Sequence, residues 1–232
     1  MRTILLALIY VILIIILAVL LLIAWPFGLR DPLLGIAKWA ISLAPPILGI
    51  KVEVSGREHV DKRTPFIFMA NHLSFIDGPL LFRLIPRPIR VILKKEVFRI
   101  PVIGQGMRFV GFVPVDRKGV RGGKKSIDHA SRLMHEKGYS YLIFPEGTRS
   151  RDGRTQAFKR GGFFLAVESQ APIVPISIAG TYGLMPRGTI FPRRGRVEVR
   201  FHPPVPVRGY DQATLGGLID KVTAVIESDL TA

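Results

Sequence analysis

Residues 65–84 read PFIFMANHLSFIDGPLLFRL, which joins an apolar strand, a polar turn and the start of a helix in one stretch. The first six residues, 65–70, are almost all apolar and are typical of a buried strand. Residues 76–84 are typical of a helix. A strand that passes directly into a helix is the unit from which α/β domains are built.

The same alternation extends along the chain from Lys51, with proline and glycine between the segments. The pattern predicts strands at residues 52–54, 65–70, 89–93, 111–115, 139–144, 173–179 and 197–201. It predicts helices at residues 76–84, 124–136, 162–169 and 213–230. We therefore expect an α/β sheet with helices on both faces.

The composition combines hydrophobicity with positive charge. The 232 residues are 48% apolar and hold 33 lysine and arginine residues against 17 acidic ones, a net charge of +16. The apolar content excludes a disordered basic tail, and the absence of cysteine excludes disulfide scaffolds, cysteine nucleophiles and thiolate zinc sites. An anionic membrane surface is favoured as a partner over nucleic acid, because the aromatic residues are not interleaved with the basic ones.

Residues 4–24 form an uncharged apolar run, long enough as a helix to match the roughly 30 Å core of a bilayer. A signal peptide has a shorter apolar region, usually of about 7–15 residues, and a small-residue cleavage site. Here Ala24-Trp25-Pro26 follows instead. We therefore predict a hydrophobic helical membrane anchor at residues 1–50, followed by a catalytic domain at residues 51–232.

A second apolar stretch, residues 33–44, is interrupted by Lys38 and closed by two prolines, so it is too short to cross a bilayer. Trp25 and Trp39 suit the headgroup level. A spanning helix followed by an interfacial helix and a two-helix hairpin that dips into one leaflet both fit this pattern.

The charge distribution predicts which side of the membrane the domain occupies. Arg2, Arg30 and Lys38 against Asp31 leave a net charge of +2 on residues 1–50, and therefore +14 on the remainder. Positive charge beside a membrane anchor is retained on the cytoplasmic side. We expect a membrane-associated protein whose catalytic domain lies on the cytoplasmic face.

His72 and Asp77 are the first candidates for chemistry. Five residues along a regular helix turn through about 500°, so the two side chains could not meet if both were helical. With His72 in the turn before the helix, its ring can meet a carboxylate from the first helical turns. The carboxylate would fix the tautomer and leave the other ring nitrogen free to accept a proton. A chance spacing between a turn histidine and a helix-start aspartate is the competing interpretation.

The second candidate is FPEGTRSR at residues 144–151, directly after a predicted strand. Glycine, a hydroxyl residue and an arginine in such a loop can direct N–H groups and a guanidinium group at one anion. The basic run KRGG at residues 159–162 precedes an apolar helix whose N-terminus would add to this positive site. Taken alone, this stretch is better explained as a solvated basic turn.

Two further blocks, GFVPVDR at residues 111–117 and APIVPI at 171–176, have the composition of ordinary core strands. Together and in this order, the four blocks resemble the glycerolipid acyltransferases, in particular the 1-acylglycerol-3-phosphate O-acyltransferases. The resemblance runs from about residue 50 to about residue 210, on blocks of His-x4-Asp, a strand ending in arginine, Glu-Gly-Thr-Arg and Val-Pro-Ile. It implies a mixed central sheet flanked by helices.

By this resemblance, His72 would be the general base and Asp77 its orienting partner. The residues implied in binding the acceptor phosphate are Arg117, Gly147, Thr148 and Arg149, with Glu146 positioning their loop. A lysine, either Lys94 or Lys95, would add to phosphate binding. Pro172 and its neighbours would line the acyl or acceptor groove.

The implied reaction moves a fatty acyl group from a thioester to the sn-2 hydroxyl of lysophosphatidic acid and gives phosphatidic acid. A base, oxyanion donors and an acceptor clamp suffice, because a thiolate is already a competent leaving group. No cofactor is expected, and the sequence shows no metal-binding pattern. The donor, acyl-coenzyme A or acyl-acyl carrier protein, stays open. So does an acceptor such as glycerol 3-phosphate or another lysolipid, and a membrane-binding module without catalysis is the alternative outside the enzymes.

Overall fold

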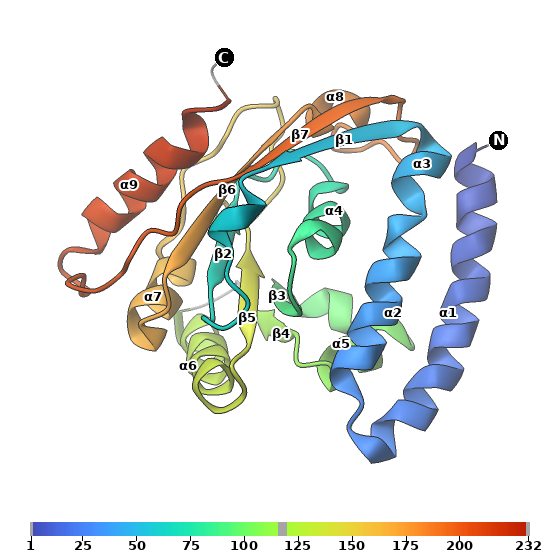
Figure 1. Cartoon of the computed structure of the whole chain (residues 1–232), viewed down its shortest axis with the longest axis horizontal. Helices are drawn as coiled ribbons and strands as arrows, with labels where there is room; N and C mark the ends of the chain where they lie inside the picture. Colours follow the sequence, from blue (N-terminus) through green and yellow to red (C-terminus); the bar gives the residue numbers. More distant parts are fainter. Residues whose placement is uncertain (1, 116–119, 231–232) are drawn as a thin grey trace.

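The computed structural model describes residues 2–115 and 120–230 of the chain. Within these residues seven strands form one sheet, in the order β1-β7-β6-β2-β5-β3-β4 (Figure 1). The strands are β1 Ile50–Ser55, β2 Ile67–Ala70, β3 Ile89–Lys94, β4 Val113–Val115, β5 Ser140–Ile143, β6 Ile173–Ala179 and β7 Gly195–Phe201. The strands predicted from the sequence are therefore present, with small shifts at their ends.

The sheet is mixed, as expected. Strands β6 and β7 are antiparallel, and every other neighbouring pair in this sheet is parallel. The parallel order places β2 between β6 and β5, and β3 beside β5. The carboxyl ends of β2, β5 and β3 therefore meet at one edge of the sheet, where open α/β sheets bind their ligands.

Helices cover both faces of the sheet, and β2 shows why. All four of its residues are buried, and neighbouring side chains point to opposite faces. Phe68 and Ala70 belong to a core cluster with helices α1, α2, α4 and α5, whereas Ile67 and Met69 belong to a cluster with α6, α7 and α9. The prediction of helices on both faces is thus confirmed.

The helices that structure and sequence share are α4 Asp77–Leu84, α6 Val120–Lys137, α7 Arg160–Ser169 and α9 Leu215–Glu227. The sequence pattern missed several short elements: α3 Ala44–Leu48, α5 Ile103–Phe109, α8 Thr181–Leu184 and the 3₁₀ helices η1 Arg57–His59 and η2 Lys95–Arg99. Helix α5 contains Gly104 and Gly106, which lower helix propensity. At Gly104 a β-carbon would lie 2.2 Å from the carbonyl oxygen of Phe98, so close packing against η2 requires glycine there.

The N-terminal segment forms the long helix α1 Arg2–Phe27, a turn at Gly28 and helix α2 Arg30–Ser42. Helices α1 and α2 lie side by side along one flank of the domain (Figure 1). Leu6 near one end of α1 and Leu21 and Ala24 near the other are buried, in the same core cluster as the sheet. Helix α1 is therefore packed along its length against the rest of the molecule.

Two polar contacts tie α2 to the domain. Arg90, almost fully buried in β3, donates from its guanidinium group to Asp31 at 2.7 Å. Lys38 donates from Nζ to the carbonyl oxygens of Ile85 and Arg87, at 2.8 and 2.6 Å, just beyond the end of α4. Burial lowers the pKa of Lys38 to about 8.

The outer side of α1 is apolar and open. Ile4, Leu8, Ile15, Leu22 and Trp25 are among its large side chains that are more than half exposed. Within the described residues, α1 is the one helix long and apolar enough to cross a membrane.

Candidate active site

His72 and Asp77 meet in the turn between β2 and α4. The Nδ1 atom of His72 lies 2.9 Å from Oδ2 of Asp77, and the same oxygen accepts the backbone N–H groups of Leu73 and Ser74, each at 2.7 Å. Asp77 is fully buried as the first residue of α4, while His72 keeps 19% of its side chain exposed. The imidazole therefore faces the carboxylate with Nδ1 and has Nε2 for a proton acceptor. Its ring stacks on Phe144, with 4.1 Å between the ring centroids.

Glu146 joins this turn to the loop after β5. Its Oε1 atom accepts the backbone N–H of His72 at 2.6 Å. Its Oε2 atom accepts the backbone N–H and the side-chain amide of Gln156, at 3.2 and 3.3 Å. Only 1% of Glu146 is exposed, and burial raises its pKa to about 7. Gln156 was not among the residues expected from the sequence, because its hydrogen bonds to Glu146 form only when the loop folds back on itself.

The rest of the loop is held close to the same turn. The backbone N–H of Ser150 donates to the carbonyl oxygen of His72 at 2.8 Å. Gly147 has φ +74°, a conformation that glycine adopts without strain and other residues rarely do. Arg149 lies over the ring of Phe75, with 5.8 Å from its guanidinium carbon to the ring centroid.

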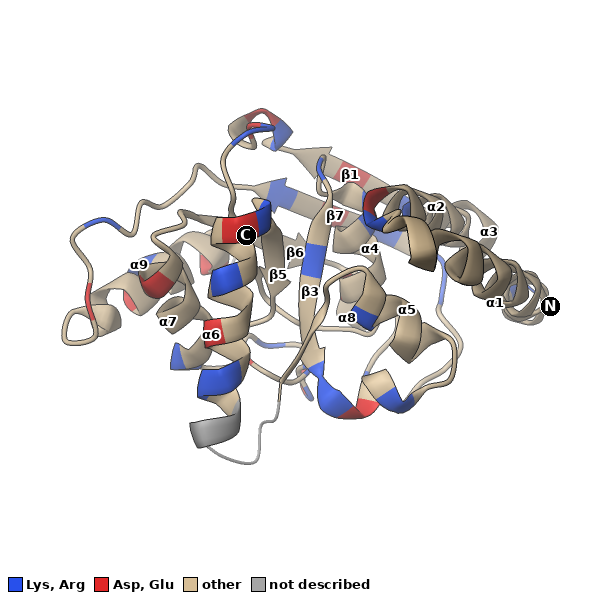
Figure 2. Ribbon diagram, turned by 90° about the horizontal axis from the view of Figure 1, so that it is seen from below, with Lys and Arg blue, Asp and Glu red and all other residues tan. Residues whose placement is uncertain are grey.

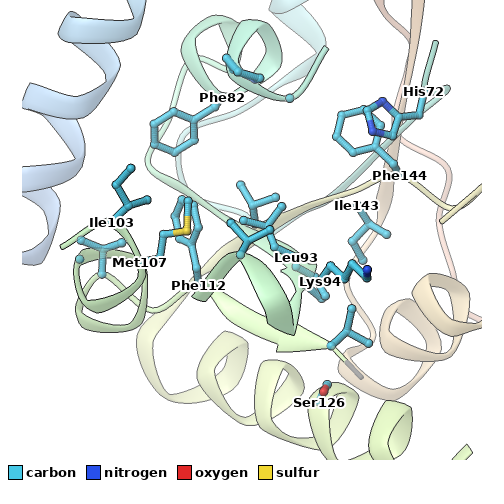
Figure 3. A pocket seen from close by; sticks show the side chains of 18 of the residues that line it. His72, Phe82, Leu93, Lys94, Ile103, Met107, Phe112, Ser126, Ile143 and Phe144 are labelled. Carbon is cyan, nitrogen blue, oxygen red and sulfur yellow. The ribbon is translucent and has the colours of Figure 1, made fainter. Parts of the chain in front are cut away.

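His72 opens onto a cavity of about 1110 Å³. At the end near His72, its polar lining includes Lys94, Thr148, Arg149 and Lys159. The rest of the lining is mostly apolar and comes from α1, α2, α4, α5 and the strand ends. Figure 3 shows His72 and Phe144 at one end and Ile103 and Met107 of α5 at the other. The arrangement places His72 and Lys94 toward one end of a mostly apolar cavity.

The family model for acyltransferases matches residues 51–179 of the chain, which include the His72 turn and the Glu146 loop. The chain belongs to the acyltransferase family. The chain is 38% identical to the 1-acyl-sn-glycerol-3-phosphate acyltransferase of Limnanthes douglasii over 159 residues, which cover 68% of this chain and 56% of the plant protein. It is 37% identical to the chloroplastic LPAT1 enzyme of Arabidopsis thaliana, named in the same way, over 73% of this chain and 48% of that one.

A solved structure of the 1-acyl-sn-glycerophosphate acyltransferase PlsC from Thermotoga maritima is similar along the whole chain. The TM-score is 0.75 at 27% identity, and the match covers 100% of this chain and 98% of that one. The chain spans about half the length of the plant relatives described above.

The sequence left open whether Lys94 or Lys95 belongs to the site. The structure distinguishes them by their position relative to the cavity. Lys94, the last residue of β3, lines the cavity, and its Nζ atom lies 3.7 Å from a carboxylate oxygen of Glu96. Lys95 begins η2 and is not among the described residues that line the cavity. In Figure 2 the segment after the β3 arrow shows this run of basic and acidic residues. Lys159, which the sequence offered only as part of a basic run, joins Lys94 in the lining.

Two of the expected residues are not brought to this site by the described structure. Pro172 lies just before β6, and its carbonyl oxygen accepts the N–H of Ile67 at the start of β2, whereas His72 follows the end of β2. The parallel pairing of these strands places Pro172 at the opposite edge of the sheet, so its position does not match the expected groove. Arg117 lies outside the described residues.

Within residues 2–115 and 120–230, no group of three or more histidine and acidic side chains is placed to bind a metal ion. The described residues of the site are thus a His72–Asp77 pair and the cationic side chains that line the same cavity.

Proposed function

We propose that this chain transfers a fatty acyl group from an acyl thioester to the sn-2 hydroxyl of 1-acylglycerol 3-phosphate, giving phosphatidic acid. The observation that carries the proposal is the position of the His72–Asp77 pair, between a cationic loop and a large apolar cavity. Such a site suits an acceptor with an anionic head and a hydrocarbon tail. The names of the two plant relatives and of the Thermotoga protein support the same reaction.

His72 would act as the general base. Its Nε2 atom takes the proton of the acceptor hydroxyl while the hydroxyl oxygen attacks the thioester carbonyl carbon. The tetrahedral intermediate then collapses, the carbon–sulfur bond breaks and the imidazolium returns its proton to the thiolate. Asp77, held by two backbone N–H groups, stabilises the imidazolium during this cycle. No covalent acyl-enzyme is required, because the thiolate is a good leaving group.

The loop residues would hold the acceptor phosphate. Arg149 supplies the guanidinium fork, with Gly147 and Thr148 beside it in the cavity lining. Lys94 is the better placed of the two candidate lysines, since it lines the cavity. Arg117 keeps its predicted role in phosphate binding on sequence grounds alone. Glu146 would fix the loop relative to His72 through its hydrogen bonds.

The apolar part of the cavity would hold hydrocarbon. Leu17 and Leu21 of α1 and Leu33 and Leu34 of α2 line it together with α5. The N-terminal helices would thus form a wall of the substrate cavity, and a lipid tail would pass from the membrane into the site without crossing water. The same geometry would let a two-tailed product leave into the bilayer.

Helices α1 and α2 would attach the chain to the cytoplasmic face of a membrane, with the domain at residues 51–232 outside the bilayer. Helix α1 is packed along its length, from Leu6 to Ala24, against the rest of the molecule. A helix bound in this way could cross a bilayer only if the domain entered the hydrocarbon as well. We therefore favour a hairpin that dips into one leaflet.

The function is tested with the purified full chain in mixed micelles and a panel of acceptors: lysophosphatidic acid, glycerol 3-phosphate, lysophosphatidylcholine and monoacylglycerol. Each acceptor is paired with acyl-coenzyme A and with acyl-acyl carrier protein, and ester product and free thiol are both quantified. The proposal expects lysophosphatidic acid to give the highest kcat/KM. A clearly higher kcat/KM for another acceptor would support acyl transfer as the reaction but would show that lysophosphatidic acid is not the preferred acceptor.

A further inference from the structure

The loop between α8 and β7 carries an exposed apolar pair inside a basic segment. Residues 185–194 read MPRGTIFPRR, with no acidic residue. Ile190 is 71% exposed and Phe191 is 62% exposed. Arg187, Arg193 and Arg194 are exposed on either side of them. An apolar tip with arginines around it matches the charge and polarity of an anionic lipid surface.

The loop is closed by its own hydrogen bonds. The backbone N–H of Arg193 donates to the carbonyl oxygen of Leu184 at 2.8 Å, which brings the two ends together. Thr189 donates from its backbone N–H and its hydroxyl to the carbonyl oxygen of Pro186, at 3.1 and 2.8 Å. Ile190 and Phe191 are therefore presented on a formed turn, so the entropic cost of ordering them at a surface is already met in part.

Acidic side chains among the described residues leave the charges of the loop unpaired. The neighbouring Arg196 pairs with Glu53 and Glu198. In the part of the chain that the structure describes, no acidic side chain pairs with Arg187, Arg193 or Arg194. These three exposed arginines can therefore bind an external anionic partner without breaking an ion pair of the described structure.

The position of the loop connects it to both the catalytic turn and α1. At its base, the carbonyl oxygen of Met185 accepts the hydroxyl of Ser74 at 2.8 Å, two residues from His72. At its other end, the side chains of Arg194 and Arg2 both lie over Gly49, where a β-carbon would be 3.1 and 2.9 Å from them. Figure 1 shows α8 and the start of β7 at the same end of the molecule as α3 and the start of α1.

We propose that the loop of residues 186–194 is a second membrane contact, in which Ile190 and Phe191 insert between lipids and the three arginines bind anionic headgroups. The inference rests on the proposed membrane attachment through α1, because the loop lies near the Arg2 end of that helix. Two contacts at separate points fix the orientation of the domain on the bilayer. Since the base of the loop holds Ser74, that orientation is passed to the turn that carries His72.

The absence of cysteine from the chain allows a direct test. Ile190→Cys is labelled with an environment-sensitive fluorophore, and the full chain is reconstituted into vesicles of phosphatidylcholine alone or with phosphatidylglycerol. Gln212→Cys, at an exposed position just before α9, is the matched control, because α9 and α1 lie on opposite sides of the molecule (Figure 1). We expect the label at residue 190 to shift its emission to the blue and to be quenched by doxyl lipids in the anionic vesicles. The label at residue 212 should do neither.

The arginines are tested in the same labelled chain. The combined change Arg187→Gln, Arg193→Gln and Arg194→Gln should abolish the difference between anionic and neutral vesicles. His72→Ala should leave the signal unchanged, so failure of the proposed catalysis is distinguished from failure of this contact. A label that stays solvated in chain shown to be vesicle-bound would overturn the proposal. A blue shift that rises with protein concentration without vesicles would assign the loop to a protein–protein contact instead.

Discussion

The backbone N–H of His72 donates to Oε1 of Glu146 at 2.6 Å, so the turn that carries the base and the loop that carries Arg149 are joined by a buried carboxylate. The contact bridges 74 residues of sequence and two neighbouring strands. Ser150 adds a second link, because its N–H donates to the carbonyl oxygen of His72. The base and the proposed phosphate clamp are thus positioned as one unit.

The first prediction concerns the carboxylate beside His72. In Asp77→Asn, an amide oxygen in the place of Oδ2 keeps the N–H groups of Leu73 and Ser74 but lacks the negative charge that stabilises the imidazolium. The reversed amide would turn its NH2 group to Nδ1, favour the tautomer with a proton on Nε2, and leave the two N–H groups unpaired. We expect turnover to fall by roughly 10²-fold or more with little change in the KM for the acceptor. The measurement is steady-state kinetics on protein shown to be folded by circular dichroism. Unchanged turnover would mean that Asp77 only caps the turn.

The ionisation of Glu146 should make the stability of the protein depend on pH. Because burial raises its folded pKa to about 7 from an ordinary value of 4.5, the native state holds a proton that the unfolded state has lost between these values. The contribution of Glu146 to the free energy of unfolding is therefore full below about pH 4.5 and is lost as the pH rises to about 7. Urea unfolding of the wild type and of Glu146→Gln should be compared over this pH range. The fall in the free energy of unfolding between about pH 4.5 and pH 7 should be smaller in the variant, by roughly 1–3 kcal/mol.

The same titration should be visible in catalysis. A carboxylate can accept from His72 and Gln156 at both oxygens, whereas the protonated acid loses acceptor capacity at one of them. We expect activity to rise through about pH 7 in part because of Glu146, and Glu146→Gln to lose that component. An identical pH profile of activity in the variant would show that the ionisation of Glu146 does not help to position the catalytic turn.

Arg149 should act on the phosphate of the acceptor. A hydrogen bond to a charged group contributes about 1.5–3 kcal/mol, so Arg149→Ala should lower kcat/KM for lysophosphatidic acid by roughly 10- to 150-fold. Arg154→Ala, an exposed arginine nearby, should cost about 0–1 kcal/mol, and less at high salt. Equal losses on lysophosphatidic acid and on monoacylglycerol, in assays of both acceptors, would contradict the phosphate assignment.

Gly106 offers a way to shorten the cavity. It lies on α5 in the cavity lining, and a β-carbon there would meet only Leu21, at 3.9 Å. Gly106→Leu should fill this end and disfavour long acyl chains by about fourfold for each displaced methylene, while short chains are still used. The measurement is kcat/KM over a series of donor lengths. Gly216→Leu, at a helical glycine of α9 with open space, should leave the preference unchanged.

The sequence predicted most of the sheet because its buried strands, such as residues 67–70 and 140–143, are short apolar runs bounded by turn residues. It also predicted the contact between His72 and Asp77, since one residue had to precede the helix and the other to begin it. These features depend on neighbours in the chain, where local pattern is informative.

The remainder depends on contacts between distant residues. Gln156 reaches Glu146 only because the loop turns back, and Asp31 meets Arg90 across 59 residues. Composition marked residues 1–50 as apolar but could not show that α1 and α2 line the cavity of the domain. The family resemblance implied a role for Pro172 in the groove, whereas strand direction places it beside the start of β2, away from His72.

The central claim, that His72 drives direct acyl transfer to lysophosphatidic acid, is tested most directly by one assay of the full chain in micelles. Wild type and His72→Ala are each given lysophosphatidic acid with an acyl thioester, and phosphatidic acid and free thiol are counted together. We expect the wild type to release one thiol for each phosphatidic acid formed, and the turnover of the variant to be lower by roughly 10²- to 10⁴-fold. Turnover by folded His72→Ala within a factor of about two of the wild type would contradict it.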